Sequence, residues 1–295
     1  SQLTNLPTPT VNYSDITNTP LSYNENGTGI QSSSSTASGD YSTAMGNGTT
    51  ASGTNSTAMG AETIASGQFS TAMGSTSEAS GIASTAIGDQ VDATGNHSTA
   101  LGFYTSASGH SSTALGFGST ASGKYGATAL GSHTIARGHT STAIGNYTTA
   151  EDIYSFIIGV HNKTDETPNP QTFSYQNTAF VIGNGGFDNV GNWLDSEGPY
   201  SNAFEVLFDG TTTIAGDLNI NSDARLKANI ISLGATLSKL LQIDGKTYTM
   251  KKDANHKKKI GLLAQDIEKV FPELVTETND IKSVNYQGLV PVLIN

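Results

Sequence analysis

The stretch Ser-Thr-Ala-Met-Gly at residues 42–46, followed by Ala-Ser-Gly at residues 51–53, is one copy of a motif that recurs along this chain. The step from an aliphatic residue to a glycine returns every 14 residues, with one interval of 15 residues near Gly126 and Ala127. The nine glycines of this step are Gly46, Gly60, Gly74, Gly88, Gly102, Gly116, Gly131, Gly145 and Gly159. A fixed period over so many copies predicts a solenoid, which occupies residues 35–159.

Each repeat unit suits two short strands joined by two tight turns, because glycines half a period apart supply positive φ at low cost. Residues between the glycines alternate, which puts Thr43 and Met45 on one face of a strand and Ser42 and Ala44 on the other. We expect the large aliphatic residue of each coil to point inward and to form a thin core once the coils stack. This column is Met45, Met59, Met73, Ile87, Leu101, Leu115, Leu130, Ile144 and Ile158. Such a core buries little apolar area, so we expect several rods to associate side by side.

Units of 14 residues with the pattern Ser-x-Ala-x-Gly resemble the head repeats of trimeric autotransporter adhesins, known as YadA-like heads. The resemblance implies a left-handed parallel β-roll that assembles as a homotrimer. The family heads often carry Val before the alanine, where this chain has Thr, so we expect a more polar core. A calcium-binding β-roll would need a recurring Asp, and collagen would need Gly at every third position; neither pattern is present.

The composition limits the possible classes of protein. The chain has 295 residues, enough for two or three domains, and no cysteine, so it forms neither disulfides nor thiolate metal sites. It has no apolar run of 18 residues, so we expect no membrane-spanning helix. Residues 1–221 carry three basic and 17 acidic side chains, which argues against nucleic acid as a partner. The histidines have no repeated spacing, and we expect neither a metal nor a cofactor.

One segment precedes the repeats, and another separates them from the last domain. Residues 1–34 are polar and contain three prolines, which predicts an N-terminal linker. Residues 160–221 break the period and are predicted to form a small β connector. Its expected strands span residues 178–182, 203–208, 211–214 and 218–220, and Asp209-Gly210 is the expected hairpin turn.

Aromatic residues mark a candidate ligand-binding face. Phe103 and Phe117 follow equivalent glycines one period apart, so they should stack on one edge of the roll, with Tyr104 beside them. Trp193, the only tryptophan, lies in a glycine-rich loop of the connector. A ligand-binding role and packing inside a trimer interface are both open for the first three residues. For Trp193, the open interpretations are a ligand contact and a packed anchor.

Residues 222–295 have a different pattern, of mixed helices and strands. We expect helices at 230–241, 264–270 and 286–294, and strands at 245–251 and 258–263. Phe271-Pro272 should end the second helix, because a proline disfavours the helical conformation in the residue before it.

This segment resembles the C-terminal intramolecular chaperone domain of phage tailspikes and endosialidases, the peptidase S74 family. The resemblance implies that the domain assists trimerisation and then cuts itself off with a Ser–Lys pair. The family's long terminal helix is missing, so we expect a truncated domain. The matching residues are Ser222, Asp223, Arg225, Leu226, Lys227, Asn229, Ile230, 261–262, 264–266, 271–275, Tyr286 and Leu289.

The chemistry expected of the Ser–Lys pair follows from its groups. A serine hydroxyl is a weak nucleophile and needs a base, which a neutral lysine amine can be. Ser222 and Lys227 are five residues apart, which is a poor helical register, so a turn or a neighbouring chain must bring the two together. Cleavage is expected between Asn221 and Ser222. Asp223 and Arg225 either support this chemistry or form a helix cap and an ion pair.

These observations favour an extracellular homotrimeric fibre that binds a cell-surface glycan or protein receptor. The chaperone resemblance favours a virion tail fibre over a bacterial surface adhesin. A glycan-degrading tailspike enzyme is a weaker alternative, because no paired carboxylates repeat in the rod. An ice-binding solenoid is another alternative, suggested by the threonine column that includes Thr43 and Thr57. No reaction on an external substrate is expected.

Overall fold

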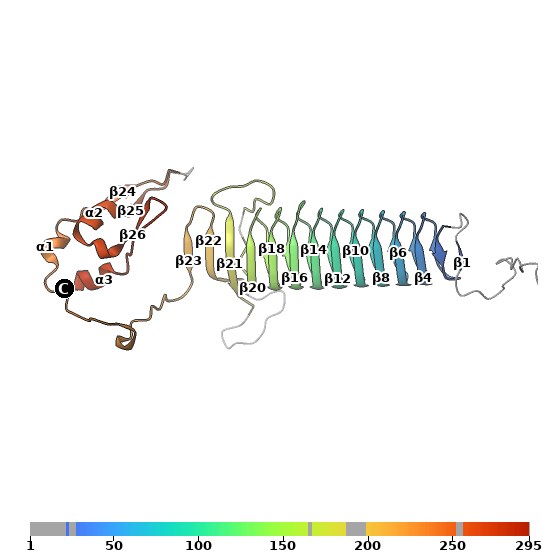
Figure 1. Ribbon diagram of the computed structural model, residues 1–295, viewed down its shortest axis with the longest axis horizontal. Coiled ribbons are helices and arrows are strands. Elements are labelled where there is room, and N and C mark those ends of the chain that lie inside the picture. The colour runs from blue at the N-terminus through green and yellow to red at the C-terminus, as the bar shows by residue number, and fades with distance from the viewer. Residues whose placement is uncertain (1–21, 24–27, 165–166, 187–198, 252–255, 295) are drawn as a thin grey trace, which may run out of the picture. The chain divides into compact units, whose positions relative to one another are not determined.

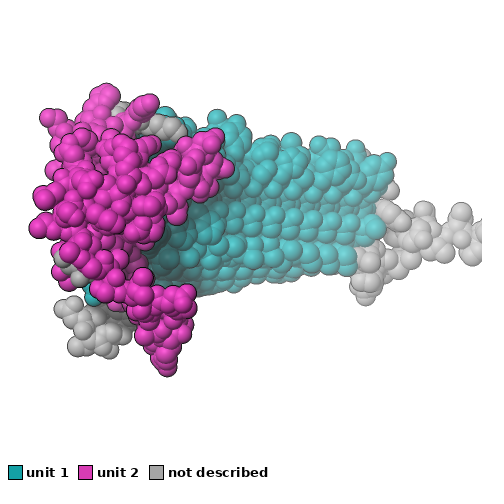
Figure 2. All heavy atoms as spheres, turned by 60° about the vertical axis from the view of Figure 1, so that its left-hand side comes forward, with its two compact units in different colours: residues 1–217 teal, residues 218–295 magenta. Residues whose placement is uncertain are grey.

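The computed structural model describes residues 22–23, 28–164, 167–186, 199–251 and 256–294 (Figure 1). The chain divides into two compact units, residues 1–217 and 218–295, which are coloured teal and magenta in Figure 2. Trp193 and most of the predicted N-terminal linker lie outside the described residues.

Two parallel stacks of strands build the roll in the first unit, which confirms the predicted solenoid (Figure 1). Sheet A holds the longer strand of each coil, and sheet B holds the shorter one. Sheet A contains β1 (Ser22–Tyr23), β2 (Ile30–Gln31), β4 (Thr43–Asn47), β6 (Thr57–Ala61), β8 (Thr71–Ser75), β10 (Thr85–Asp89), β12 (Thr99–Phe103), β14 (Thr113–Phe117), β16 (Thr128–Ser132), β18 (Thr142–Asn146), β20 (Phe156–Val160), β21 (Thr178–Asn184), β22 (Asn202–Leu207) and β23 (Thr212–Ile214). Sheet B contains β3 (Thr36–Ala37), β5 (Thr50–Ala51), β7 (Ile64–Ala65), β9 (Glu78–Ala79), β11 (Asp92–Ala93), β13 (Ser106–Ala107), β15 (Thr120–Ala121), β17 (Ile135–Ala136) and β19 (Thr149–Ala150).

The repeat period fixes the register between coils. Equivalent residues are direct partners in neighbouring strands, as in Leu101 with Leu115 and Gly102 with Gly116. The longer coil keeps this register, because its additional residue is accommodated in the turn at 124–126. Every column of the repeat therefore becomes a straight row of like side chains along the roll.

The interior of the roll is lined by small residues. Ala100, its equivalents in sheet A and the alanines of sheet B are fully buried, together with the columns that contain Ser42 and Thr49. The prediction that the aliphatic column points inward is wrong: Leu101 lies on the opposite face of the same strand and is only partly covered. The alternation was read correctly, but the face that is buried between the two sheets is the one with the small residues. The interior is polar as expected, although through Ser42 and Thr49 rather than through Thr43, which faces outward.

Side-chain amides close both ends of sheet B. At the N-terminal end, Gln31 Oε1 accepts a hydrogen bond from the backbone N–H of Ala37 at 2.9 Å. At the other end, Asn162 Oδ1 accepts from the N–H of Thr149 at 2.7 Å, and its Nδ2 donates to the carbonyl of Thr149 at 3.0 Å. These amides pair backbone groups that would otherwise be open to another strand.

The connector strands extend sheet A beyond the repeats. β21 pairs in parallel with β20 and keeps the glycine register, with Gly159 opposite Gly183. β22 and β23 then follow as antiparallel strands, joined at the predicted Asp209-Gly210 turn. The strand predicted at 218–220 is absent, because these residues form no backbone ladder and are exposed.

The second unit is a small α+β fold with its own core, which consists of Ile267, Phe271, Leu274, Leu289 and Val292. No helix among the described residues of the chain is long and apolar enough to cross a membrane. The elements of the second unit are η2 (Ala224–Leu226), α1 (Leu237–Leu240), β24 (Lys246–Tyr248), β25 (Lys259–Gly261), α2 (Ala264–Val270), η3 (Pro272–Leu274), β26 (Val275–Thr278), β27 (Ile281–Val284) and α3 (Leu289–Ile294).

Three features of this unit differ from the sequence predictions. The first helix is restricted to Leu237–Leu240, because Gly234 adopts a φ of +68° that no right-handed helix can continue through. The last helix begins at Leu289 rather than at residue 286. The β26–β27 hairpin was not predicted, although its turn residues Asn279 and Asp280 both adopt positive φ, as a two-residue hairpin turn requires.

Candidate functional site

The outer surface of sheet A carries two rows of side chains, and we call this surface the aliphatic face. One row contains Thr43 and its equivalents, and the other is the aliphatic column from Met45 to Ile158. Most members are half-buried within the single chain, and Ile87 and Leu115 are 36% and 37% exposed. The rows are continuous because each strand repeats the same alternation in register. The result is a straight row of aliphatic side chains along the outer surface of sheet A.

Phe103 and Phe117 stack on one edge of the roll, as predicted. Their ring centroids are 5.4 Å apart with an interplanar angle of 29°. Tyr104 packs its ring edge against Phe103 at 4.2 Å. The turn after Gly102 positions all these rings, since Phe103 ends β12 and Tyr104 adopts the left-handed conformation that follows it. Both Tyr104 and Phe117 keep about half of their surface exposed.

The stack continues well beyond the two phenylalanines. Phe117 contacts His133 at 4.9 Å, and His133 lies parallel to Tyr147 at 4.5 Å. Tyr147 meets His161 at 4.6 Å, and His161 stacks on Tyr200 at 5.3 Å. We call the rings from Phe103 to Tyr200 the aromatic ladder. The sequence contained the signal for most of it, because these residues occupy the two positions after the repeat glycines; Tyr200 comes from the connector and could not be found that way.

Ser222 and Lys227 lie side by side, as their proposed chemistry requires. Lys227 Nζ donates a hydrogen bond to Ser222 Oγ at 2.6 Å, and both residues are exposed. The short helix η2 makes this contact possible, because it turns the chain back between the two residues. In this arrangement the lysine is the donor. It would have to lose its proton before it could accept the hydroxyl proton.

Asp223 and Arg225 support this turn. The Asp223 carboxylate caps η2 by accepting from the N–H of Arg225 at 2.8 Å, and it pairs with the guanidinium through Nη2 at 2.6 Å. The side-chain hydrogen bonds from Arg225, followed by its backbone N–H, hold the pKa of Asp223 below its usual value. The carboxylate therefore stays ionised and keeps the turn that brings Ser222 and Lys227 together.

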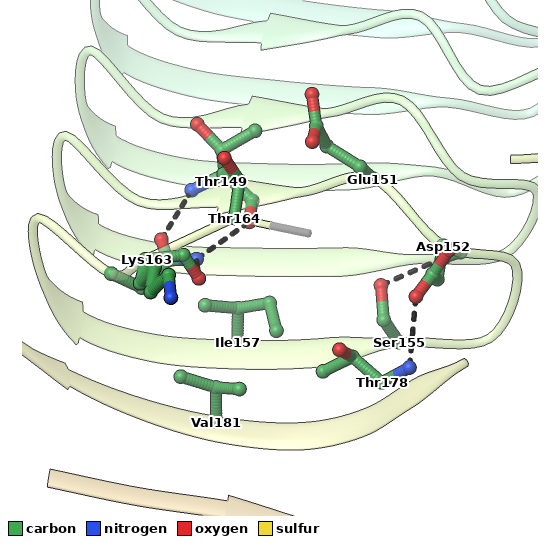
Figure 3. Close-up of a pocket in the computed structure, with 10 residues that line it drawn as sticks. Thr149, Glu151, Asp152, Ser155, Ile157, Lys163, Thr164, Thr178 and Val181 are labelled. Carbon is green, nitrogen blue, oxygen red and sulfur yellow. Dashed lines mark hydrogen bonds between the residues drawn. The ribbon is translucent and has the colours of Figure 1, made fainter. Parts of the chain in front are cut away.

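A small hollow lies at the C-terminal end of the roll (Figure 3). Asp152, which occupies the position of a repeat glycine, points its buried carboxylate at the chain that follows the roll. It accepts from the backbone N–H of Asn169 at 2.6 Å and of Thr178 at 2.8 Å. Sequence analysis missed this residue, although the replacement of glycine by aspartate at the last coil was a visible signal. Because backbone N–H groups occupy the Asp152 carboxylate, we interpret the hollow as part of the structure that ends the roll and not as a ligand site.

Known families match both units of the chain. The family described as "YadA head domain repeat (2 copies)" matches five stretches, namely residues 37–63, 65–90, 107–134, 124–148 and 136–156. The family described as "Chaperone of endosialidase", Peptidase_S74, matches residues 222–276. The chain carries YadA head repeats and an S74 chaperone domain.

Curated relatives with similar sequence are phage tail-fibre proteins. The chain is 36% identical to the long tail fiber protein Gp37 of Salmonella phage S16 over 83 residues, which is 25% of this chain. It is 28% identical to the protein of the same name from Escherichia phage AR1 over 125 residues, or 38% of this chain. Each match spans 11% of the relative's length.

Proposed function

We propose that this chain is part of a homotrimeric, tail-fibre-like adhesive fibre that lies outside the cell on a virion and binds a receptor on the cell surface. The named relatives and the combination of head repeats with an S74 domain support this assignment. The observation that carries it is the aliphatic face, which runs over the whole roll without interruption.

The aliphatic face is best covered by another chain that carries the same repeat. Among the described residues, the interior of a single roll holds mainly alanine, serine and threonine, with few larger apolar side chains such as Val91 and Ile157, so one chain buries little apolar area. Covering the aliphatic column would remove its remaining exposed surface from water, at roughly 25 cal/mol per Å². A second and third copy present the same row at the same spacing, so all nine coils can pair at once. This argument favours parallel copies packed around a common axis.

The assembly is tested by light scattering of the full chain. We expect a mass of three chains. The double variant Leu101→Asp and Leu115→Asp should weaken the trimer, because each substitution puts an unpaired charge into the interface at a cost of several kcal/mol. Thr120→Asp, on the outer face of sheet B, is the matched control and should leave the mass unchanged. A stable monomer of the unmodified chain would disprove the assembly. Adsorption of the fibre to intact bacterial cells tests the adhesive role.

The S74 domain is proposed to release itself after assembly. With Lys227 as the base, Ser222 Oγ attacks the carbonyl carbon of Asn221, and the serine proton passes through the lysine to the departing amide nitrogen. The resulting ester between Asn221 and Ser222 is then hydrolysed by one water molecule. The products are a carboxylate at Asn221 and a free amine at Ser222. The 2.6 Å contact between Lys227 and Ser222 supports these roles.

A further inference from the structure

A second row of aromatic residues lies on the edge of the roll where the chain turns after each Ala-x-Gly segment. The second residue after the glycine is left-handed there, with φ of 57° at Tyr41, 59° at Phe69 and 58° at His97. Asn55 and Ala83 hold the same position in the coils between them. Rings therefore occur in alternate coils, about 10 Å apart, which is twice the spacing of neighbouring strands. We call Tyr41, Phe69 and His97 the edge row.

Two rings of the edge row, Tyr41 and Phe69, differ from the aromatic ladder in how they are packed, whereas His97 lies 5.4 Å from His110. Ladder rings contact one another, whereas Tyr41 is 69% exposed and Phe69 is 55% exposed. In the described part of the chain, no aromatic ring lies against either of these two. The left-handed conformation is shared by Asn55 and Ala83 in the coils between these rings, so it belongs to the turn and not to the aromatic side chains. Large exposed rings that pack against no other ring of the chain indicate contact with another molecule.

Polar groups surround the edge row and limit what it can bind. The exposed side chains of Asp40, Asn55, Gln68 and Asn96 flank the rings. Carboxylate and amide groups can accept hydrogen bonds from hydroxyls, and amides can also donate to them. No lysine or arginine occurs before Lys124, so this half of the roll offers no cation to a phosphate or carboxylate group. The surface therefore suits a partner that is rich in hydroxyls and uncharged.

We propose that the edge row binds an extended, uncharged glycan, with its rings packed on the C–H faces of every second sugar. The spacing of about 10 Å is close to the length of one disaccharide in an extended chain. A regular row matches a repeating polymer, whereas a folded protein partner has no need of equal spacing. This inference rests on the proposed receptor binding and adds the binding site and the chemical class of the receptor.

The test uses the full trimeric chain with Tyr41→Asn and Phe69→Asn combined. Asparagine already occupies this position at Asn55, so the fold should tolerate both changes. The probes are maltohexaose, cellohexaose and the neutral polysaccharide purified from bacterial cells to which the native protein adsorbs. We expect the native chain to bind at least one probe and the double variant to bind it at least tenfold more weakly, since two ring contacts are lost. Ala83→Asn, at the equivalent position of the coil between Phe69 and His97, is the control and should bind as the native chain does.

Several outcomes would overturn the glycan site while leaving receptor binding intact. The double variant could bind cells and probes like the native chain. Protease treatment of the cells, but not periodate oxidation of their sugars, could abolish adsorption, which would identify a protein receptor. A lower melting temperature of the double-variant trimer would place the rings between copies of the chain. A native trimer that adsorbs to no cell and binds no probe would instead contradict the proposed function as well.

Discussion

At the scale of single residues, the repeat glycines at the end of each sheet A strand are the positions that tolerate least change. Gly102 adopts a φ of +125°, and a Cβ built there would lie 2.0 Å from the carbonyl oxygen of Gly116. Gly48, in the turn, also has positive φ, but its nearest contact to a Cβ would be Glu62 Cγ at 3.6 Å. Only the first site combines a conformation closed to other residues with a backbone clash.

We therefore expect Gly102→Ala to lower the free energy of unfolding by several kcal/mol, because the coils on either side must move apart. Gly48→Ala should cost about 1 kcal/mol, the price of the left-handed conformation alone. Thermal melting followed by circular dichroism measures both. Equal melting temperatures for the two variants would contradict the proposed clash between coils.

At the scale of elements, the short strands of sheet B place two carboxylates side by side. Glu78 in β9 and Asp92 in β11 are direct partners in adjacent parallel strands. Partial burial, and then repulsion from Glu78, raise the pKa of Asp92 above its ordinary value of 3.8. A raised pKa means that the folded chain holds the proton more tightly than the unfolded chain. The charged form at neutral pH therefore destabilises the roll, and protonation at acid pH removes this penalty.

We expect Asp92→Asn to stabilise the roll at pH 7 by a few tenths of a kcal/mol, as is typical when one of two opposed like charges is removed. The gain should shrink as the pH falls through the raised pKa and disappear below the ordinary value. Melting temperatures from pH 7 to pH 3 measure this trend. Glu62→Gln, an exposed carboxylate in a turn, is the control that should show no comparable gain. A gain that grows toward acid pH would contradict the argument.

At the scale of the whole molecule, the proposed self-cleavage would separate the S74 domain from the roll. We expect the assembled trimer to release a fragment that begins at Ser222, because Lys227 lies within hydrogen-bond distance of the Ser222 hydroxyl. Ser222→Ala and Lys227→Ala should stay whole yet still assemble. Mass spectrometry of the fragment identifies its first residue. Cleavage at the same bond in Ser222→Ala would show that the nucleophile is wrong.

The architecture of the roll could be predicted from the 14-residue period, because the period places equivalent residues of successive coils in register. It also placed Phe103 beside Phe117, because equivalent positions of a solenoid must be neighbours. The residues matching the S74 family marked Ser222 and Lys227, although their contact depends on the turn through η2. In each of these cases the residues that interact are close in sequence or separated by one repeat period, so their proximity can be predicted without the folded structure.

Which face of the alternating strands lies inside the roll could not be predicted from the sequence and is known from the folded chain. Both faces read as plausible cores, one of alanine and one of aliphatic side chains, and alternation cannot choose between them. The folded chain buries small residues such as Ala100 and Ala107 between the two sheets and leaves the aliphatic column on the outer face. The hydrogen bonds of Asp152 and Asn162 at the end of the roll could not be predicted from the sequence either. Their partners come from another coil or from the connector, and a pairing across such distances in sequence exists only once the chain has folded.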